Sequence, residues 1–414
     1  MENASRYEKI LVAILFLSWG TVFLDRMSQL YLAPYLASEF RLNHEQIGLL
    51  ASVLAITWAI STLIFGALSD HIGRRPILIP AVFAFSLLSW VSGVVHSFNQ
   101  LLLVRALMGL AEGPTWSIIT ALSEESSPPE RRGRNVGIVV SAAALVGLAI
   151  APVLSTQVAA RWGWRWAFFV AGVPGIAMGV LIWKFVREPY RDLRIKAEEK
   201  PLFRDYLSVL RYRNMWLCCV GSSGFVSWLF LHNVFAPIYI TEVAHQAPTT
   251  AGFLLGAGGL GSFVQAFIFP ALSDRFGRKP VLLLLSAMSA TVPLILLVSS
   301  LYSHIWVLAT ILFLTNGGQA LASLIMVLVP TESVPQRFAA TSIGLATLTG
   351  EVFGATVAPL VGGAAAQKYG PGTTLWMSAA GTGLIFIATL FLAKTSAVPG
   401  GRTGRQERPA HALH

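Results

Sequence analysis

The sequence predicts an all-α membrane protein whose twelve transmembrane helices form two pseudo-symmetric six-helix bundles. The first observation is composition: 55% of the residues are hydrophobic and 12% are charged, whereas soluble proteins carry roughly 25% charged residues. The second is a series of apolar runs, each close to the about 20 residues that cross a bilayer. The third is a charged string at residues 66–76 that recurs almost unchanged at residues 270–280. One such string in each half indicates an internal duplication.

The apolar runs account for twelve spans. The run after Lys9 is too long for the apolar core of a signal peptide, so it is expected to be the first span. The spans are expected at residues 9–35, 45–69, 77–96, 99–123, 134–159, 164–186, 214–240, 250–273, 280–299, 303–329, 338–365 and 371–394. The chain then divides into an N-terminal bundle (1–187), a cytoplasmic linker with an amphipathic pattern (188–213), a C-terminal bundle (214–396) and a disordered cytoplasmic tail (397–414).

Basic residues predict the orientation of the spans. They are concentrated in the linker and in the loops that follow spans two, four and eight, at Arg74, Arg75, Arg131, Arg132, Arg134, Arg275, Arg278 and Lys279. Because cytoplasmic loops of membrane proteins carry an excess of Lys and Arg, both termini and the linker are expected on the cytoplasmic side of a bacterial inner membrane. The net charge of +10 is therefore explained by topology, and we expect no nucleic-acid partner.

The two halves share motifs beyond the charged string. Residues 124–132 (Glu-Glu-Ser-Ser-Pro-Pro-Glu-Arg-Arg) resemble residues 331–337 (Thr-Glu-Ser-Val-Pro-Gln-Arg), and residues 147–152 resemble residues 354–359. Two six-helix bundles in parallel repeat, joined by a basic linker, resemble the major facilitator superfamily over the whole chain.

Motifs inside the spans narrow the resemblance. Residues 105–109, Arg-Ala-Leu-Met-Gly, are similar to that superfamily's Arg-x-x-x-Gly motif. Asp25-Arg26 in span one, Glu112 seven residues after Arg105, and residues 163–169 (Gly-Trp-Arg-Trp-Ala-Phe-Phe) resemble the anion:cation symporter branch. That branch includes hexonate and sialic acid carriers and vesicular glutamate transporters. The resemblance implies transport of a small organic anion by alternating access, through a protein that we expect to act as a monomer in the lipid bilayer.

Ionisable side chains deep in the membrane are candidates for substrate binding. Each costs about 2.5–3.5 kcal/mol on insertion scales, so it is functional by default. The set is Asp25, Arg26, Arg105, Glu112 and Glu351. Arg26 and Arg105 offer forked donors for a carboxylate or phosphate and are expected to bind the anion. The alternative is a pair of internal salt bridges, with Arg105 bound to Glu112 or to a group in span one.

The buried acids are candidates for proton transfer. Burial raises the pKa of a carboxyl and a nearby arginine lowers it, so Asp25 and Glu112 are expected to carry the coupling proton; the alternative is that each is a permanent counter-ion of an arginine. Glu351 departs from relatives, which carry Asn there and use it to contact substrate. We expect Glu351 to bind substrate, and it leaves room for a zwitterionic substrate, a second proton or a role in helix packing.

Polar and aromatic residues elsewhere in the spans complete the expected pocket. Tyr31, Trp228 and Asn233 are expected to contact substrate, and the weaker candidates are His232, Gln265, Asn316 and Gln319. Each of these residue types serves equally well as an interhelical packing contact, and His232 is expected to be neutral.

The repeated loops predict a conformational latch on the cytoplasmic side. Asp70 is expected to cap a neighbouring helix and pair with Arg74 or Arg134, and Asp274 is expected to pair with Arg278. The alternative, that these charges only set the topology, explains the basic residues but not the two aspartates.

The most consistent function is proton-coupled uptake of a small organic anion, with no cofactor other than the proton. The sequence contains no Gly-x-x-x-x-Gly-Lys-Ser/Thr phosphate loop to use ATP, no metal-ligand spacing of histidines and no catalytic triad, so we expect a transporter and not an enzyme. Proton-driven efflux is the main alternative, because residues 147–152 keep part of an antiporter motif, although Ser155-Thr156 replace its closing glycines. A non-transporting membrane receptor would not need the latch motifs.

Overall fold

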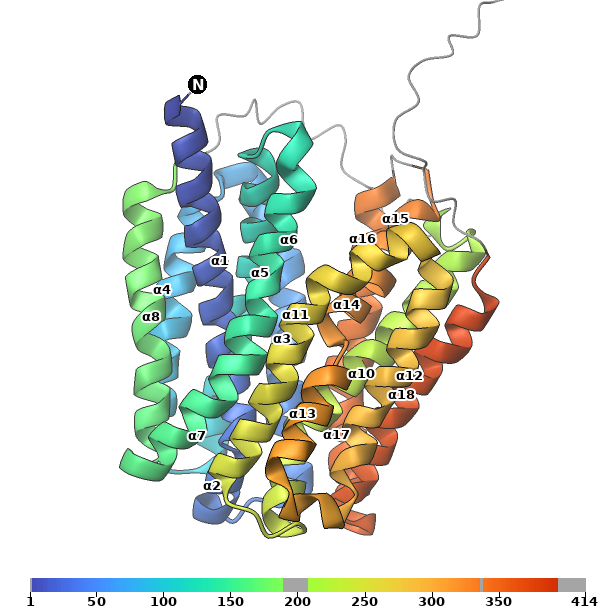
Figure 1. Ribbon diagram of the computed structural model, residues 1–414. Helices are drawn as coiled ribbons and strands as arrows, with labels where there is room; N and C mark the ends of the chain where they lie inside the picture. Colours follow the sequence, from blue (N-terminus) through green and yellow to red (C-terminus); the bar gives the residue numbers. More distant parts are fainter. Residues whose placement is uncertain (1, 189–207, 336–337, 394–414) are drawn as a thin grey trace, which may run out of the picture.

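The computed structural model describes residues 2–188, 208–335 and 338–393, without the side chains of residues 2–5, 70 and 340. The N-terminal half contains α1 (Glu2–Tyr31), α2 (Ala33–Phe40), α3 (His44–Ile72), α4 (Arg75–Ser92), α5 (Phe98–Glu125), η1 (Pro129–Arg131), α6 (Arg132–Ala142), η2 (Ala143–Ile150), α7 (Ala151–Trp162) and α8 (Trp164–Phe185). The C-terminal half contains α10 (Arg213–Glu242), α11 (Pro248–Phe276), α12 (Arg278–Leu296), η4 (Ser299–Ser303), α13 (Ile305–Thr315), α14 (Gly318–Ala322), η5 (Ser323–Leu328), α15 (Val329–Glu332), α16 (Ala339–Thr349), η7 (Gly350–Val357), α17 (Ala358–Tyr369) and α18 (Gly372–Phe391). The two halves stand side by side (Figure 1).

The helices confirm the predicted all-α membrane fold. Within the described residues, eleven helical segments are long and apolar enough to cross a membrane. The twelfth span is α5, which has 28 residues and packs against α3 and α4. Its lower apolarity has a clear source, because it carries Arg105 and Glu112 in its middle and two glutamates at its end. Most of the predicted linker and the whole predicted tail lie outside the described residues.

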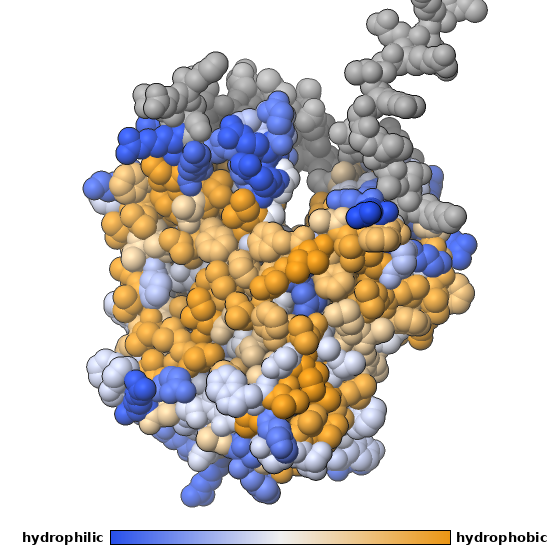
Figure 2. Space-filling view, in the orientation of Figure 1, coloured by the Kyte–Doolittle hydropathy of each residue, from blue (hydrophilic) through white to orange (hydrophobic). Residues whose placement is uncertain are grey.

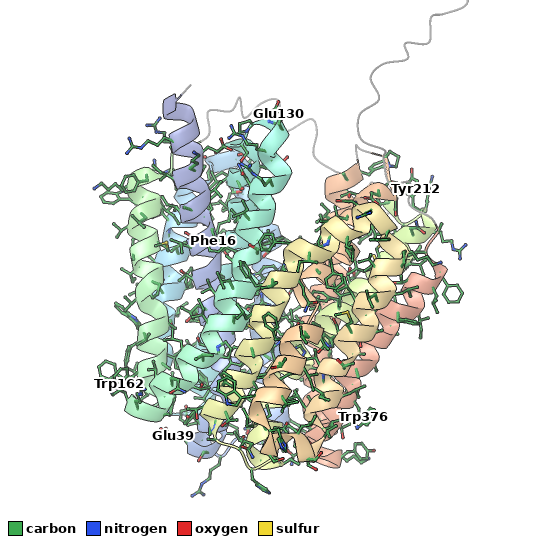
Figure 3. The ribbon with its side chains drawn as sticks, in the orientation of Figure 1. Phe16, Glu39, Glu130, Trp162, Tyr212 and Trp376 are labelled. Carbon is green, nitrogen blue, oxygen red and sulfur yellow. The ribbon has the colours of Figure 1, made fainter. Side chains whose placement is uncertain are left out.

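The surface matches a bilayer. Figure 2 shows a broad apolar belt between two polar ends of the molecule. Figure 3 labels Glu130 and Tyr212 at one end, which we call the linker end, and Glu39, Trp162 and Trp376 at the other, which we call the far end. Trp162 and Trp376 are each 63% exposed. Exposed tryptophans near one end of an apolar belt are typical of the membrane interface.

The turn that carries the repeated charged string has the same backbone in both halves. Gly73 between α3 and α4 has a φ of 102°, and Gly277 between α11 and α12 has a φ of 93°. Residues that carry a side chain rarely adopt a positive φ, so the turn requires glycine at this position of each Asp-x-x-Gly-Arg string. This duplication of backbone geometry agrees with the duplication predicted from the sequence.

Three spans are less regular than their apolar patterns predict. Spans five, ten and eleven each contain a π-helical segment, namely η2, η5 and η7, and each segment ends two residues before a proline. A proline has no N–H to donate and its ring crowds the carbonyl four residues earlier, which widens the preceding turns. Span ten is also interrupted between α13 and α14, at Asn316-Gly317.

The halves meet along two helix pairs. In one pair, α3 packs against α17 and η7, and in the other, α11 packs against α7 and η2. Glycines allow the close approach: a Cβ on Gly48 of α3 would collide with the carbonyl oxygen of Pro359, and one on Gly259 of α11 would collide with that of Leu148. Because the obstructing atoms belong to backbone, they cannot rotate away, so these crossings need glycine.

We expect Gly259→Ala to reduce transport by at least about tenfold while the protein still folds, because overpacking by one methyl group costs about 1–3 kcal/mol and here would push the halves apart. Gly383→Ala in α18 is the matched control, since its added Cβ meets no atom of the described chain within 4 Å. Counterflow in liposomes, with thermal unfolding of both variants, measures the effect. Wild-type exchange by Gly259→Ala would contradict the proposed role of this crossing.

Candidate functional site

A large cavity lies between the halves at the middle of the molecule. The centre of a water molecule can occupy about 160 Å³ of it, and the surrounding empty space of about 970 Å³ includes open solvent. Side chains of α1, α3 and α5 line it from the N-terminal half, and side chains of α10, η5, α16 and η7 line it from the C-terminal half. Both halves therefore contribute to one site, which is the arrangement that alternating access requires.

Arg26 is the cation of this cavity. Its side chain is 3% exposed, and its Nη2 lies 3.3 Å from Oε2 of Glu351 on η7. The guanidinium carbon lies 5.1 Å from the ring centres of both Trp58 and Phe230, and Nε has no hydrogen-bond partner within the described chain. A guanidinium has five N–H donors, so this one retains donors for a further ligand.

Glu351 joins the two halves through Arg26. It is one of the predicted substrate-binding residues, and it lines the cavity. The pair links residues 325 positions apart in the chain. The two charges balance each other, so a substrate carboxylate that binds Arg26 must share the guanidinium with Glu351 or displace it.

A second group of ionisable residues lies behind the cavity wall. Asp25, Arg105 and Glu112 are at most 1% exposed and lie close enough to interact electrostatically. The four carboxylate oxygens of Asp25 and Glu112 make no hydrogen bond of ordinary geometry with the described residues, although the two carboxyls lie near each other and the hydroxyl of Ser89 lies near Asp25. Two carboxyls that share a dry site cannot both stay charged without a large penalty.

Arg105 bonds to groups on its own helix and on α1. Its Nη1 lies 3.1 Å from the sulfur of Met108, and its Nη2 lies 3.4 Å from the carbonyl oxygen of Arg26. It is not one of the described residues that line the cavity. The two predicted arginines therefore lie next to each other, but only Arg26 is among the described residues that line the cavity.

Tyr31, Asn233 and Trp228 lie together in a neighbouring polar group. The Tyr31 hydroxyl donates to Oδ1 of Asn233 (2.8 Å), and the Asn233 amide nitrogen lies 3.0 Å from Nε2 of His232. Trp228 donates from Nε1 to the carbonyl of Ser289 (3.0 Å). His232, Asn233 and Asn316 line a separate small cavity. Of these bonds, the one between Tyr31 and Asn233 crosses between the halves. Of the weaker candidates, only Gln319 is among the described residues that line the main cavity.

Polar contacts close the molecule at the far end. His44 at the start of α3 lies 3.1 Å from Glu242 at the end of α10, and its backbone N–H donates to Gln367 of α17. Ser52 donates to the carbonyl of Thr356 at 2.6 Å. At the linker end, Figure 2 shows a gap between the two halves. The cavity is thus separated from the far end by bonded contacts.

Sequence reasoning missed the aromatic wall around Arg26. Trp19, Phe23 and Arg26 line the cavity from α1, and Trp58, Trp116 and Phe230 face it from other helices. The spacing of residues 19, 23 and 26 places them on one face of a helix, so this part of the wall was detectable. The residues contributed by other helices carry no such signal.

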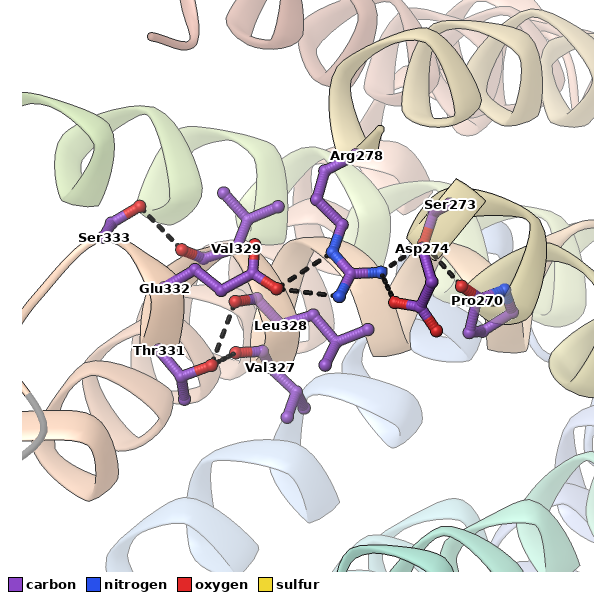
Figure 4. Close-up of polar contacts among 10 residues, drawn as sticks. All are labelled: Pro270, Ser273, Asp274, Arg278, Val327, Leu328, Val329, Thr331, Glu332 and Ser333. Carbon is purple, nitrogen blue, oxygen red and sulfur yellow. Dashed lines mark hydrogen bonds and ion pairs between the residues drawn. The ribbon is translucent and has the colours of Figure 1, made fainter. Parts of the chain in front are cut away.

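The repeated loops form matching ion clusters, and Figure 4 shows the cluster of the C-terminal half. Arg278 forms the predicted pair with Asp274 (2.6 Å), and it also pairs with Glu332 (2.7 Å) and donates to Ser273. In the other half, Arg74 lies 3.2 Å from Glu125 and donates to Ser69. The side chain of Asp70 lies outside the described residues. Glu125 and Glu332 were missed as cluster members, although the repeated Glu-Ser of both loops is the signal that identifies them.

Asp274→Asn is expected to slow exchange severalfold without changing substrate affinity, because Asp274 is 67% exposed and lies outside the cavity. An exposed pair contributes about 0–1 kcal/mol, and Glu332 still holds Arg278 in the variant. Equilibrium binding and counterflow rates measure the two effects, with Arg275→Gln in the same turn as the control. Weakened binding with an unchanged rate per bound substrate would contradict a latch.

Known proteins share this architecture. The family model described as Major Facilitator Superfamily matches residues 15–359. The chain belongs to this superfamily. A probable 4-methylmuconolactone transporter of Cupriavidus pinatubonensis is 31% identical over 277 residues, which are 65% of this chain and 63% of that protein. The hexuronate transporter of Bacillus subtilis is 28% identical over 291 residues, which are 66% of this chain and 68% of that one.

A solved structure has the same fold. A bacterial homologue of the human lysosomal transporter Spinster, in an inward-facing and occupied conformation, superposes with a TM-score of 0.72 at 18% identity, covering 93% of this chain and 96% of that one. At this identity the likeness shows the fold alone, and with the family match it makes the chain a multi-pass membrane protein of the major facilitator type. The organic-acid transporters among its relatives confirm the resemblance to the anion:cation symporter branch.

Proposed function

We propose that this major facilitator protein is a proton-coupled symporter that takes up a small organic anion across the bacterial inner membrane. The observation that carries the proposal is Arg26: a buried guanidinium with unused donors, facing a cavity built by both halves. Relatives named for transport of organic acids support an anionic substrate. The positive-inside pattern of the loops supports a cytoplasmic linker end.

In this proposal, the substrate carboxylate binds Arg26 and competes with Glu351. Asp25 lies next to Arg26 in the chain, and Arg105 contacts the carbonyl of Arg26. A change in charge at Arg26 therefore acts on the neighbouring group of Asp25, Arg105 and Glu112. We assign the coupling proton to Asp25 and Glu112, because their carboxylates make no hydrogen bond of ordinary geometry with the described residues that would hold them charged. Arg105 acts in this scheme as the residue that connects the two sites.

Alternating access would use the contacts that the structure displays. The far-end contacts of His44 and Ser52 would open to admit substrate, and the glycine-lined crossings would act as pivots. The ion clusters around Arg74 and Arg278 would bias the equilibrium at the linker end. We expect the protein to perform this cycle as a monomer.

A proton-driven efflux antiporter is the second candidate, since an apolar cavity wall also suits hydrophobic drugs. The side of the membrane on which substrate accumulates, relative to the pH gradient, distinguishes symport from antiport. Liposomes that contain the protein are given a pH gradient of either direction, and accumulation of a radiolabelled organic acid is followed with an ionophore control. We expect accumulation on the alkaline side. Accumulation on the acidic side would overturn symport in favour of antiport.

A further inference from the structure

The wall of the main cavity is unusually apolar for a site that binds an anion. Of the twenty lining residues, fifteen are aromatic or aliphatic, and six of these are aromatic. The only neutral polar side chains are Gln319, Ser323 and Thr347. The Ser323 hydroxyl already donates to the carbonyl of Gln319 at 2.9 Å. The cavity therefore offers few hydrogen bonds beyond those of Arg26 and Glu351.

The apolar lining of the cavity discriminates between the molecular frameworks to which a substrate carboxylate can be attached. A sugar acid brings several hydroxyl groups, and each one that leaves water without a partner weakens binding. An aromatic ring brings no such groups, and burying it against Trp58 and Phe230 is favourable. Three neutral polar side chains cannot supply hydrogen bonds to all the hydroxyl groups of a sugar acid. The cavity wall therefore favours a substrate with an aromatic ring.

The charges also limit the number of carboxylates. Arg26 is the one cation among the described residues that line the cavity, and Glu351 already pairs with it. Arg105 is buried behind the wall and bonds to Met108 and to the backbone of Arg26. A second carboxylate on the substrate would meet no cation and would be repelled by Glu351. The site therefore fits one carboxylate.

We propose that the cavity takes a small aromatic monocarboxylate, with its carboxylate on Arg26 and its ring against the aromatic wall. This proposal rests on the proposed organic-anion transport and specifies its substrate class. It excludes sugar acids and dicarboxylates as preferred substrates.

The test compares ligands that differ in one property at a time. Benzoate and phenylacetate are measured against gluconate and glucuronate, against the dicarboxylate phthalate and against uncharged benzyl alcohol, by titration calorimetry and by counterflow in liposomes. We expect benzoate or phenylacetate to bind and exchange at least about tenfold better than all the others. Tighter binding of a sugar acid or of phthalate would overturn the substrate class but leave anion transport intact. Binding by none of the acids would overturn both.

A matched pair of variants tests the wall directly. Met326 of η5 lines the cavity, and glutamine has nearly its shape but adds an amide. We expect Met326→Gln to bind the aromatic acid about three- to tenfold more weakly than Met326→Leu, which keeps an apolar side chain of similar size. Equal affinities in the two variants, or tighter binding by Met326→Gln, would overturn the claim that an apolar wall recognises the substrate.

Discussion

Arg26→Ala is expected to abolish substrate binding. The side chain is buried, it supplies the only guanidinium among the described residues that line the cavity, and its Nε has no partner there. Removing one partner of a buried, hydrogen-bonded charge pair from a binding site costs about 2–5 kcal/mol, which corresponds to a loss of about thirtyfold to several-thousandfold in affinity. Titration calorimetry of the purified variant against the transported acid measures this loss.

The controls separate a binding defect from a folding defect. Alanine at position 26 leaves Glu351 without its cation, so the double variant Arg26→Ala/Glu351→Gln restores charge balance in the cavity while leaving no anion site. We expect this double variant to unfold near the wild-type temperature and still not to bind. Arg26→Lys should bind poorly, because an ammonium lacks the forked donor geometry. Wild-type affinity in the lysine or double variant would show that Arg26 does not bind the anion.

Glu112→Gln is expected to separate exchange from accumulation. Glutamine keeps the volume and hydrogen bonding of a protonated glutamate, but it cannot release a proton. The variant should bind substrate and exchange it in counterflow, since exchange needs no net proton movement. It should lose nearly all accumulation driven by a pH gradient. Both assays are made on one liposome preparation, with Glu124→Gln, an exposed glutamate near the end of the same helix, as the control.

The competing explanation gives a different result. If Glu112 is only the counter-ion of Arg105, neutralising it leaves a buried charge unpaired and should lower expression and unfolding temperature. In the structure Arg105 contacts the sulfur of Met108 and the carbonyl of Arg26, and the carboxylate of Glu112 makes no hydrogen bond of ordinary geometry with the described residues. Gradient-driven accumulation that survives in Glu112→Gln would transfer the coupling role to Asp25 or Glu351.

The fold was predictable because its signals are local. Apolar runs mark the spans, and the Asp-x-x-Gly-Arg string marks the same turn twice, with positive φ at Gly73 and Gly277. The membrane-embedded charges were also predictable, since each is rare enough to stand out in an apolar run. The π-helical segments were not predicted, although the prolines that end them are visible in the sequence.

The arrangement of the site depends on contacts between distant helices. The sequence of span one does not indicate that Arg26 pairs with Glu351 in span eleven, and that of span four does not indicate that Arg105 lies outside the cavity lining. Tyr31 and Asn233 carry the polar groups expected of a pocket, yet they bond to each other across the halves. Helical periodicity identifies a polar face, but the partner of that face is set by tertiary packing.

Coupling between the anion and the proton is tested most directly by observing the proton itself. Liposomes that contain the protein and a trapped pH-sensitive dye are prepared with no pH gradient, their membrane potential is clamped with potassium and valinomycin, and the transported acid is added outside as its fully ionised salt. The account predicts acidification of the lumen at a rate that follows substrate entry, and no acidification with Glu112→Gln even though counterflow persists. Substrate entry without acidification in the wild-type protein, or alkalinisation of the lumen, would contradict proton symport.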